Sequence, residues 1–398
     1  MAVRYSEAAA QPVTRELVTT FADEVFADLP RVDQRRWARV YLEGLLAVRG
    51  RKSVRQVAAA ASGSATASQS LQQFVNASTW DWAPVRQALA RRVGELTTAR
   101  AWSIRTVVLP KRGEHSCGVH RRFVPAAGRI LNCQLGVGAF LSADEGDLPL
   151  EWGLLLPEEW GADRLRERAR VPDDARQQPL WAQVLDLVDS VAGGTASASL
   201  PVVVDMSDDP DAALLVDGLS RRRRGFLVAV PPTLPVLPAG SRGTADSCAA
   251  DSSAAKVAPP GPETAARSLL ARGAPYLLAG DRAGHTRARS CLARLPGGDA
   301  VHRLVGKQTS GAARTPPVWL TNLDGRPDQL LAVARLQSRS AVAAADLARD
   351  HGMSDFEGRS FPGWHHHMTL VSTAYAYRRL IEPLASPGEV GEPLLRAG

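Results

Sequence analysis

The chain has 398 residues, 45% of them hydrophobic and 22% charged, which is typical of a globular protein with about two or three domains. No apolar run approaches the roughly 20 residues of a membrane span, which excludes a transmembrane protein, and four scattered cysteines without a CxxC pair or a secretory leader indicate a reducing cytoplasm. The net charge of +7 favours a polyanionic partner, although on charge alone a solvated arginine-rich surface accounts for it equally well.

The first hundred residues are expected to be helical. Apolar side chains recur at helical spacing, as Trp37, Tyr41 and Leu45 do, before a stop at Gly50. Residues 53–61 and 68–78 flank a Gly/Ser/Thr-rich turn in the proportions of a helix-turn-helix, although plain packing of two helices is the commoner reason for such a pattern. The basic residues of this region that we assign to DNA contact are Arg35, Arg36, Arg51, Lys52 and Arg55.

From Ala101 the pattern changes to strands. Residues 103–110, 128–143 and 148–157 are β-rich runs separated by Gly, Pro and charged turns. A helix is expected over residues 180–194, and then an apolar strand that ends at Asp205, a further helix and a further strand. Strands that first meander and then alternate with helices predict a mixed α/β domain.

The rest of the chain is expected to divide in two. Residues 231–317 are rich in Pro, Gly, Ser and Ala, which predicts an irregular insertion outside the core. Order resumes near residue 318, with a long helix over 328–352 and another from residue 363. The expected organisation is a helical, DNA-binding N-terminal domain (1–100), an α/β core (101–230), the insertion (231–317), and core completion with C-terminal helices (318–398).

Asp205 ends its strand where α/β enzymes place functional carboxylates. The acidic residues that follow it fit the first turn of a helix better than a metal site, because acids are favoured there. They are Asp208, Asp209 and Asp211. Alone, Asp205 is a weak indication of function.

Five runs give Asp205 a context. They are "LPRVDQRRWARVYLEGLL", "LPKRGEHSCGV", "LPLEWGLLLPEEW", "VVVD" and "DFEGRSFPGWHHHMTL". In this order they resemble DDE transposases of the insertion sequence 701 family, over roughly residues 28–230 and 318–380. The resemblance implies a ribonuclease H-like core in which an Asp, Asp, Glu triad holds two divalent ions, Mg²⁺ being expected, for phosphoryl transfer on DNA.

The acidic positions of that family are only partly retained. Asp205 matches the second acid, but Arg105 and Thr106 stand before the "PKRG" turn where the family has acids, and Ala341 stands at the position of the Glu. Since two dications require several converging carboxylates, we expect that the metal is lost and that no metal site remains. Asp346 and Asp350 could replace the Glu only if the helix slid or rotated.

Two histidine clusters invite a metal interpretation. His115, Cys117, His120 and Cys133 combine thiols and imidazoles, but their spacing matches no standard zinc module, and surface imidazoles with a small buried cysteine are the favoured interpretation. The run 365–367 is "HHH" at a helix start. Its side chains point to different sides and cannot all bind one ion, which favours packing or a phosphate contact.

Two basic turns complete the candidate DNA contacts. The first is the "PKRG" turn. The second lies between the helix after Asp205 and the next strand, and is either a solvated turn or a non-specific contact to the DNA backbone, with equal weight. Together these turns contribute Lys111, Arg112, Arg221, Arg222, Arg223 and Arg224.

We therefore expect a transposase-like protein with a degenerate site, inactive in transposition and retained as a double-stranded DNA-binding or regulatory protein; a homo-oligomer is left open. One alternative is a repurposed enzyme that uses Arg105, Asp205 and His115 on a small molecule in the old cleft. The other is an active transposase with shifted metal ligands.

Overall fold

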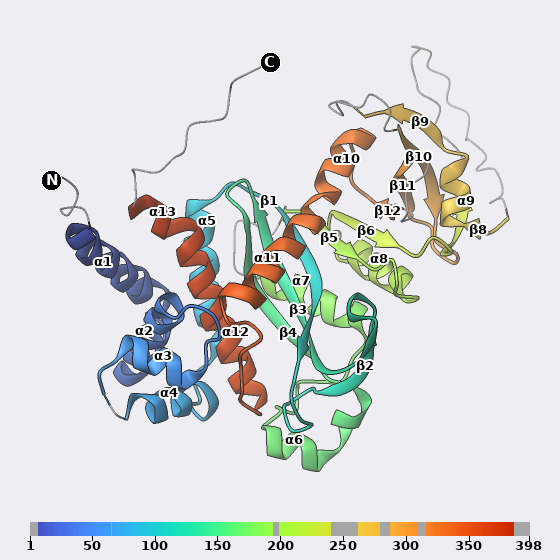
Figure 1. The fold of residues 1–398 in the computed structure, drawn as a ribbon. Helices are drawn as coiled ribbons and strands as arrows, with labels where there is room; N and C mark the ends of the chain where they lie inside the picture. The colour runs from blue at the N-terminus through green and yellow to red at the C-terminus, as the bar shows by residue number, and fades with distance from the viewer. Residues whose placement is uncertain are drawn as a thin grey trace.

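The computed structural model describes residues 7–64, 66–193, 199–239, 262–278, 287–308 and 316–385. Figure 1 shows a helical end, a central sheet and a second group of strands at the far end. The first hundred residues are helical, as predicted: α1 (Glu7–Val25), α2 (Val32–Ala47), α3 (Val54–Ala61), α4 (Ala67–Asn76) and α5 (Trp82–Leu96). No helix in these residue ranges is long and apolar enough to span a membrane.

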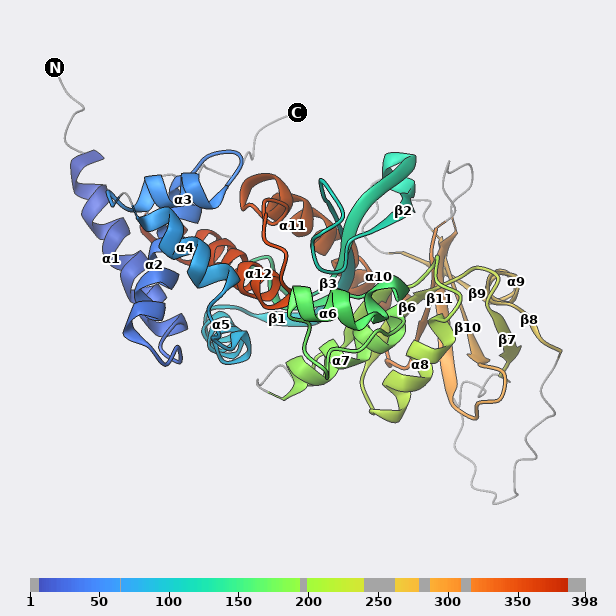
Figure 2. The ribbon, with the colours of Figure 1, turned by 90° about the horizontal axis from the view of Figure 1, so that it is seen from below.

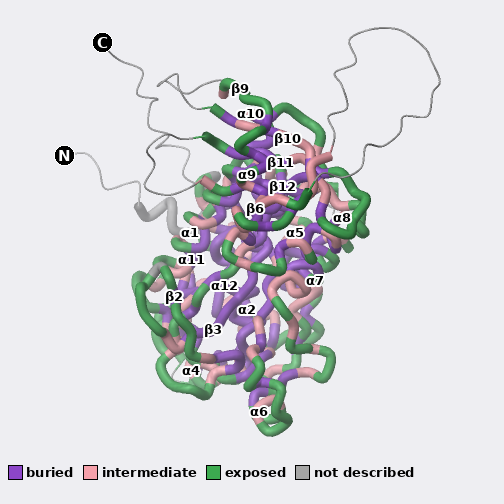
Figure 3. Tube along the Cα trace, turned by 90° about the vertical axis from the view of Figure 1, so that its right-hand side faces the viewer, coloured by how far each residue is buried: buried purple, intermediate pink, exposed green. Residues whose placement is uncertain are grey.

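A helix from the other end of the sequence completes the helical end. It is α12 (Phe361–Ala376), which continues into a π turn (Tyr377–Ile381) and α13 (Glu382–Ala385). Every residue of α12 except Pro362 is buried, as expected for a helix surrounded by neighbours. It packs against α2, α4, α5 and the sheet, and Figure 3 shows α12 and the sheet interior buried together.

The central sheet has mixed strand directions. Its strands are β1 (Ala99–Pro110), β2 (His120–Val124), β3 (Arg129–Ala143), β4 (Asp147–Leu155), β5 (Val202–Asp205) and β6 (Phe226–Val230). β3 lies antiparallel between β1 and β4, whereas β1, β5 and β6 are parallel neighbours. This order is that of a ribonuclease H-like core and confirms the expected mixed α/β fold class.

Helices cover both sides of this sheet. They are α7 (Leu180–Ala192), α8 (Ala212–Arg221), α10 (Pro327–Ala334) and α11 (Leu336–Asp350), and two 3-10 turns (Pro125–Ala127, Glu158–Gly161) and α6 (Asp163–Ala169) lie in the connections. In Figure 2 the strands run between α11 on one side and α7 with α8 on the other. The long helix predicted over 328–352 is two helices, with Arg335 between them.

The expectation that residues 231–317 lie outside the core is wrong for the part described. β12 (Val318–Thr321) extends the sheet beyond β6, and further strands follow: β11 (Val301–Gln308), β10 (Arg287–Arg294), β7 (Pro235–Pro238), β8 (Thr264–Ala265) and β9 (Ala274–Leu277). Helix α9 (Ala266–Ala271) packs on β10 and β11. The stretch is rich in alanine, proline and glycine, but its described part forms short strands, whose inward residues such as Ala288 and Leu304 are buried. Residues 240–261, 279–286 and 309–315 lie outside the described ranges.

Arg86 of α5 connects the helical end with the sheet. Its guanidinium is 2% exposed and forms an ion pair with Glu151 of β4. It also donates to the Trp152 carbonyl (3.0 Å), to Thr369 Oγ1 (2.8 Å) and to the His365 carbonyl (3.2 Å). Because the guanidinium is buried and the Glu151 carboxylate is only partly exposed, the loss of either partner leaves the other poorly solvated.

Candidate functional site

The parallel strands β1 and β5 set the geometry of the site. Their register pairs Ile104 with Val204. The next residues, Arg105 and Asp205, therefore stand side by side at the carboxyl end of β5. Asp205 is exposed and its Oδ1 accepts a hydrogen bond from the backbone of Ser207 (3.0 Å), so the strand ends in a turn fixed by its own carboxylate.

A cavity of about 750 Å³ opens at this end of the sheet. All four positions singled out in the sequence line it: Arg105, Thr106, Asp205 and Ala341. Its walls include residues of β2, of the loop after β5, of the first turns of α11, and of β4, α7 and β12. The positions at which a DDE triad is expected thus converge in space, although they are up to 236 residues apart in sequence.

Arg105 is bonded to the helix that covers it. One of its terminal nitrogens donates to the Gln337 carbonyl (2.9 Å) and to Ser340 Oγ (3.2 Å), both in the first turns of α11. Burial lowers the pKa of the guanidinium, and the carboxylate of Asp205 opposes that shift. The group remains a cation, because an arginine keeps its proton in any protein environment. A positive charge therefore occupies the place expected for a metal-binding acid.

The carboxylates that line the cavity all come from the end of β5 and the loop that follows it. Asp208 and Asp209 accompany Asp205 there, and Asp209 Oδ1 accepts a hydrogen bond from the backbone of Asp211 (2.9 Å). β1 and α11 contribute none to the lining. Among the described residues, no group of three His, Cys, Asp or Glu side chains is arranged to hold a metal ion. The donor set does not fit the pair of dications that the resemblance implies.

Asp346 and Asp350 lie further along α11 and do not line the cavity. Asp346 pairs with Arg349 (2.6 Å) and Arg379 (3.2 Å), and Asp350 pairs with Arg349 (3.0 Å). Asp346 is five residues beyond Ala341, which places it about 140° around the helix. Both acids are therefore directed to other partners.

The predicted small-molecule cleft needs one correction. His115 is exposed and is not part of the cavity lining; His120 of β2 lines it instead. Sequence reasoning also missed Gln337, whose Nε2 donates to the Ile104 carbonyl (3.0 Å) and ties α11 to β1. Its only sequence signal is its place four residues before Ala341 on the same helix face.

In the predicted cluster of two cysteines and two histidines, both cysteines are buried. Cys117 is 1% exposed, and burial raises the pKa of its thiol to about 12. Cys133 is buried as well, and burial raises its pKa. Thiolates are the metal-binding form of cysteine, so both residues fit the expectation of small buried side chains.

Residues 365–367 pack inside the helical end, and all three imidazoles are buried. His366 places Nδ1 and Nε2 each 2.8 Å from a carbonyl oxygen, those of Val75 and Trp80. His367 Nε2 lies 2.9 Å from the Gly352 carbonyl, and its Nδ1 lies 3.1 Å from the Tyr41 hydroxyl. None faces solvent, so the packing interpretation holds and a phosphate contact does not.

Burial divides the basic residues assigned to DNA. Lys52 is 2% exposed, and its ammonium donates to the Val48 carbonyl, so its assignment as a DNA contact is wrong. Lys111 is half-buried and donates to the Phe356 carbonyl (2.7 Å); burial lowers its pKa to about 8. Arg35 is half-buried and donates to the Leu29 carbonyl, and Arg224 is half-buried. The exposed members of the set are Arg36, Arg51, Arg55, Arg112, Arg221, Arg222 and Arg223.

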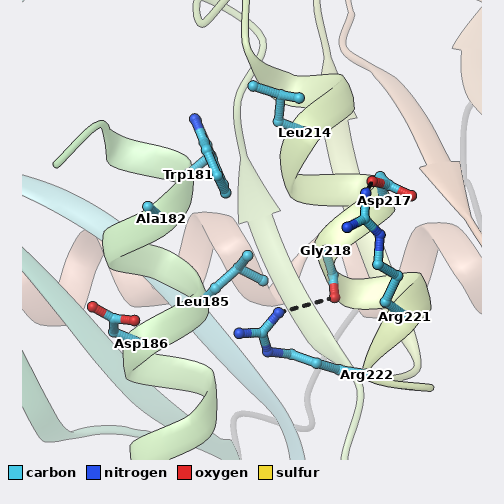
Figure 4. Close-up of a pocket in the computed structure, with 9 residues that line it drawn as sticks. All are labelled: Trp181, Ala182, Leu185, Asp186, Leu214, Asp217, Gly218, Arg221 and Arg222. Carbon is cyan, nitrogen blue, oxygen red and sulfur yellow. Dashed lines mark hydrogen bonds and ion pairs between the residues drawn. The ribbon is translucent and has the colours of Figure 1, made fainter.

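The arginine-rich turn borders a second, smaller cavity of about 310 Å³ between α7 and α8. Figure 4 shows Trp181 and Leu214 on its walls and the Arg222 guanidinium directed to the Gly218 carbonyl (3.3 Å). Arg222 also makes a two-pronged ion pair with Asp189, with both distances 2.8 Å. Arg222 is thus engaged within the fold, and the freer cation of the turn is Arg223, which is exposed.

Comparison with known proteins adds one finding. A family model described as DDE superfamily endonuclease matches residues 24–263, which is more than half of the chain. The matched segment includes β1 and β5, with Arg105 and Asp205, and ends before α11, so the placement of Ala341 rests on the geometry of the cavity. No curated protein matches the chain.

Proposed function

The chain belongs to the DDE superfamily endonucleases, and we propose that it is a DNA-binding member, of the insertion sequence 701 group, that has lost metal-dependent strand transfer. A regulatory role at a DNA site is the function we assign to it. One observation supports the loss most directly: Arg105 stands beside Asp205 in the cavity, with Ala341 on the facing helix.

Electrostatics explains why this arrangement opposes catalysis. A guanidinium about 5 Å from a dication is repelled by roughly 6–7 kcal/mol at an effective dielectric constant near 20. The missing carboxylate bonds add to that cost, since the triad supplies the negative charge that offsets the two ions. Arg105 instead ties β1 to α11, so the strand and the helix stay together without a metal.

Affinity for DNA does not depend on the lost acids. It requires exposed cations that displace counterions from phosphates, and seven of the arginines assigned to DNA are exposed. The family acts on nucleic acid, so a duplex is the partner that accounts for both the match and the basic surface.

Fluorescence anisotropy with a labelled duplex, at salt concentrations from about 50 to 300 mM, tests this proposal. We expect binding at low salt and a steep loss of affinity as salt rises. The same duplex incubated with Mn²⁺ should stay intact. Absence of binding at about 50 mM salt would overturn the DNA-binding role, and cleavage that requires Asp205 would overturn the loss of catalysis.

A further inference from the structure

We propose that α4 is a base-reading helix, which places its outward face in the major groove of duplex DNA while α3 contacts the phosphates. This inference rests on the proposed DNA-binding function and deepens it, because it adds recognition of sequence to binding. The residues concerned are Ser68, Gln69, Gln72 and Gln73 on α4, with Arg55 at the start of α3 and Arg51 just before it.

The burial pattern of α4 separates two faces. Leu71, Phe74 and Val75 are buried against the rest of the helical end, whereas Gln69, Gln72 and Gln73 are exposed. Beyond the helix ladder, the described hydrogen bonds of Gln72 and Gln73 use their main-chain carbonyls. The side-chain amides are left to solvent.

The chemistry of this face is unusual for a solvated helix surface. Exposed helix faces normally carry charges, as α6 does with its sequence DRLRERA. The outward face of α4 is uncharged and rich in amides instead. A glutamine amide offers a donor and an acceptor side by side and pairs with N6 and N7 of adenine in the major groove.

A polar groove of about 400 Å³ joins α4 to the start of α3. Arg51, Arg55 and Gln56 line one side, and Ser68 and Gln72 line the other. In helix-turn-helix proteins the first residues of the second helix reach base edges while the first helix meets the backbone. In this groove the arginines lie on the side of α3, where the backbone would be contacted, and the amide of Gln72 lies on the side of α4, where bases would be read.

Charge in this part of the chain suits a polyanion. Between Glu43 and Asp81 the sequence has no acidic residue and four basic ones. Arg49, Arg51 and Arg55 are exposed. One carboxylate reaches the groove from elsewhere: Glu357, which pairs with Arg51. Removing it should therefore strengthen binding to any duplex.

Helix α4 is also fixed in place by contacts on its buried face. Its last turn lies against α12, where His366 reaches the Val75 carbonyl (2.8 Å) and stacks on Trp80 with ring centroids 3.9 Å apart. Ser360 Oγ donates to the Asn76 carbonyl (3.2 Å). A fixed helix presents its side chains at defined positions, as base readout requires.

The experiment is selection from a pool of duplexes with a randomised centre, followed by anisotropy on the selected duplex and on a scrambled one. We expect an enriched sequence with wild-type protein. Gln69→Ala, Gln72→Ala or Gln73→Ala should each weaken binding to the selected duplex by about 5- to 100-fold while leaving the scrambled duplex unaffected. Arg55→Ala should weaken both duplexes and reduce the salt slope by about one.

Gln87→Ala on α5 is the matched control, since Gln87 is an exposed glutamine on a helix outside the groove. It should bind like the wild type, and thermal unfolding should show that all variants are folded. Glu357→Gln should tighten binding to both duplexes. Base reading by α4 would be overturned if the wild type bound DNA without enriching any sequence. It would also be overturned if the glutamine variants kept their preference for the selected duplex. Either result would leave the proposed DNA-binding function standing. Failure to bind any duplex would overturn both.

Discussion

The cavity at the end of β1 and the outward face of α4 differ in how their polar groups are satisfied. In the cavity, Arg105 is bonded to α11 and Asp205 to its own turn. On α4, the side-chain amides of Gln72 and Gln73 are directed to solvent. A polar group satisfied within the fold serves as structure, whereas one that only water satisfies can exchange water for a ligand. The difference supports our proposal that the region of the cavity serves as scaffold while the helical end offers a binding surface.

The largest expected effect is on stability, at the contact by which Arg86 connects the helical end with the sheet. Arg86→Ala removes a buried cation and leaves Glu151 without its ion-pair partner, so the free energy of unfolding should fall by about 3–5 kcal/mol. Urea denaturation followed by circular dichroism measures this change. Arg100→Ala, which removes an exposed ion pair with Asp144, is the control and should change stability little. Equal losses of stability in the two variants would show that Arg86 does not hold the helical end and the sheet together.

The next effect concerns pH and the helical end. Burial lowers the pKa of His367 to about 4, from an ordinary value of 6.5. A histidine with a lowered folded-state pKa binds protons more readily when unfolded, so stability is lost as pH falls from about 6.5 towards 4. The loss at pH 4.5 should be about 2–3 kcal/mol for this residue.

The variant His367→Gln isolates that contribution. Denaturation at pH 7 and at pH 4.5 should give a smaller difference in stability for the variant than for the wild type. An unchanged difference would mean that His367 does not titrate in this range.

A smaller effect is expected at the cavity. Arg105→Ala breaks the bonds to Gln337 and Ser340, which should lower stability by about 1–3 kcal/mol. Thr106→Ala is the matched control, because Thr106 is exposed at the next position; it should stay within about 0.5 kcal/mol of the wild type. If Arg105→Ala proved as stable as Thr106→Ala, the guanidinium would not serve as scaffold.

The smallest effect separates free from engaged arginines. Arg112→Ala removes an exposed cation and should reduce the salt dependence of DNA binding by about one ion if Arg112 meets a phosphate. Arg222→Ala removes a cation already paired with Asp189 and should leave that slope unchanged. Anisotropy titrations at several salt concentrations compare the two, and a larger change for Arg222→Ala would reverse this ranking of the basic residues.

Local patterns in the sequence were sufficient to predict much of this structure. Helical periodicity marked α1 to α5, and apolar runs between turn residues marked β1, β3 and β4. The position of Asp205 at a strand end followed from the same patterns. Its convergence with Arg105 and Ala341 followed from the resemblance, since no local signal joins residues so far apart.

The predictions that failed concern features that local sequence patterns do not encode. Lys52 was assigned to DNA, yet its backbone donates to Asp355 (2.8 Å) and Gly352 covers its stem. Arg86 was overlooked because its partner, Glu151, lies 65 residues away in the sequence. Whether a charged side chain is buried depends on partners that only the fold brings near. The strands β10 and β11 were missed because proline and glycine in the turns outweighed the short alternating runs between them.

Calorimetric titration with Mn²⁺ tests most directly the claim that the metal chemistry is lost. It should be made on the wild type, on Asp205→Ala, and on a double variant, Arg105→Asp with Ala341→Glu, which returns acids to β1 and α11. We expect no binding heat for the first two proteins and a gain of binding in the double variant. Wild-type binding that disappears in Asp205→Ala would contradict this claim, because carboxylates other than the lost pair would then hold the metal.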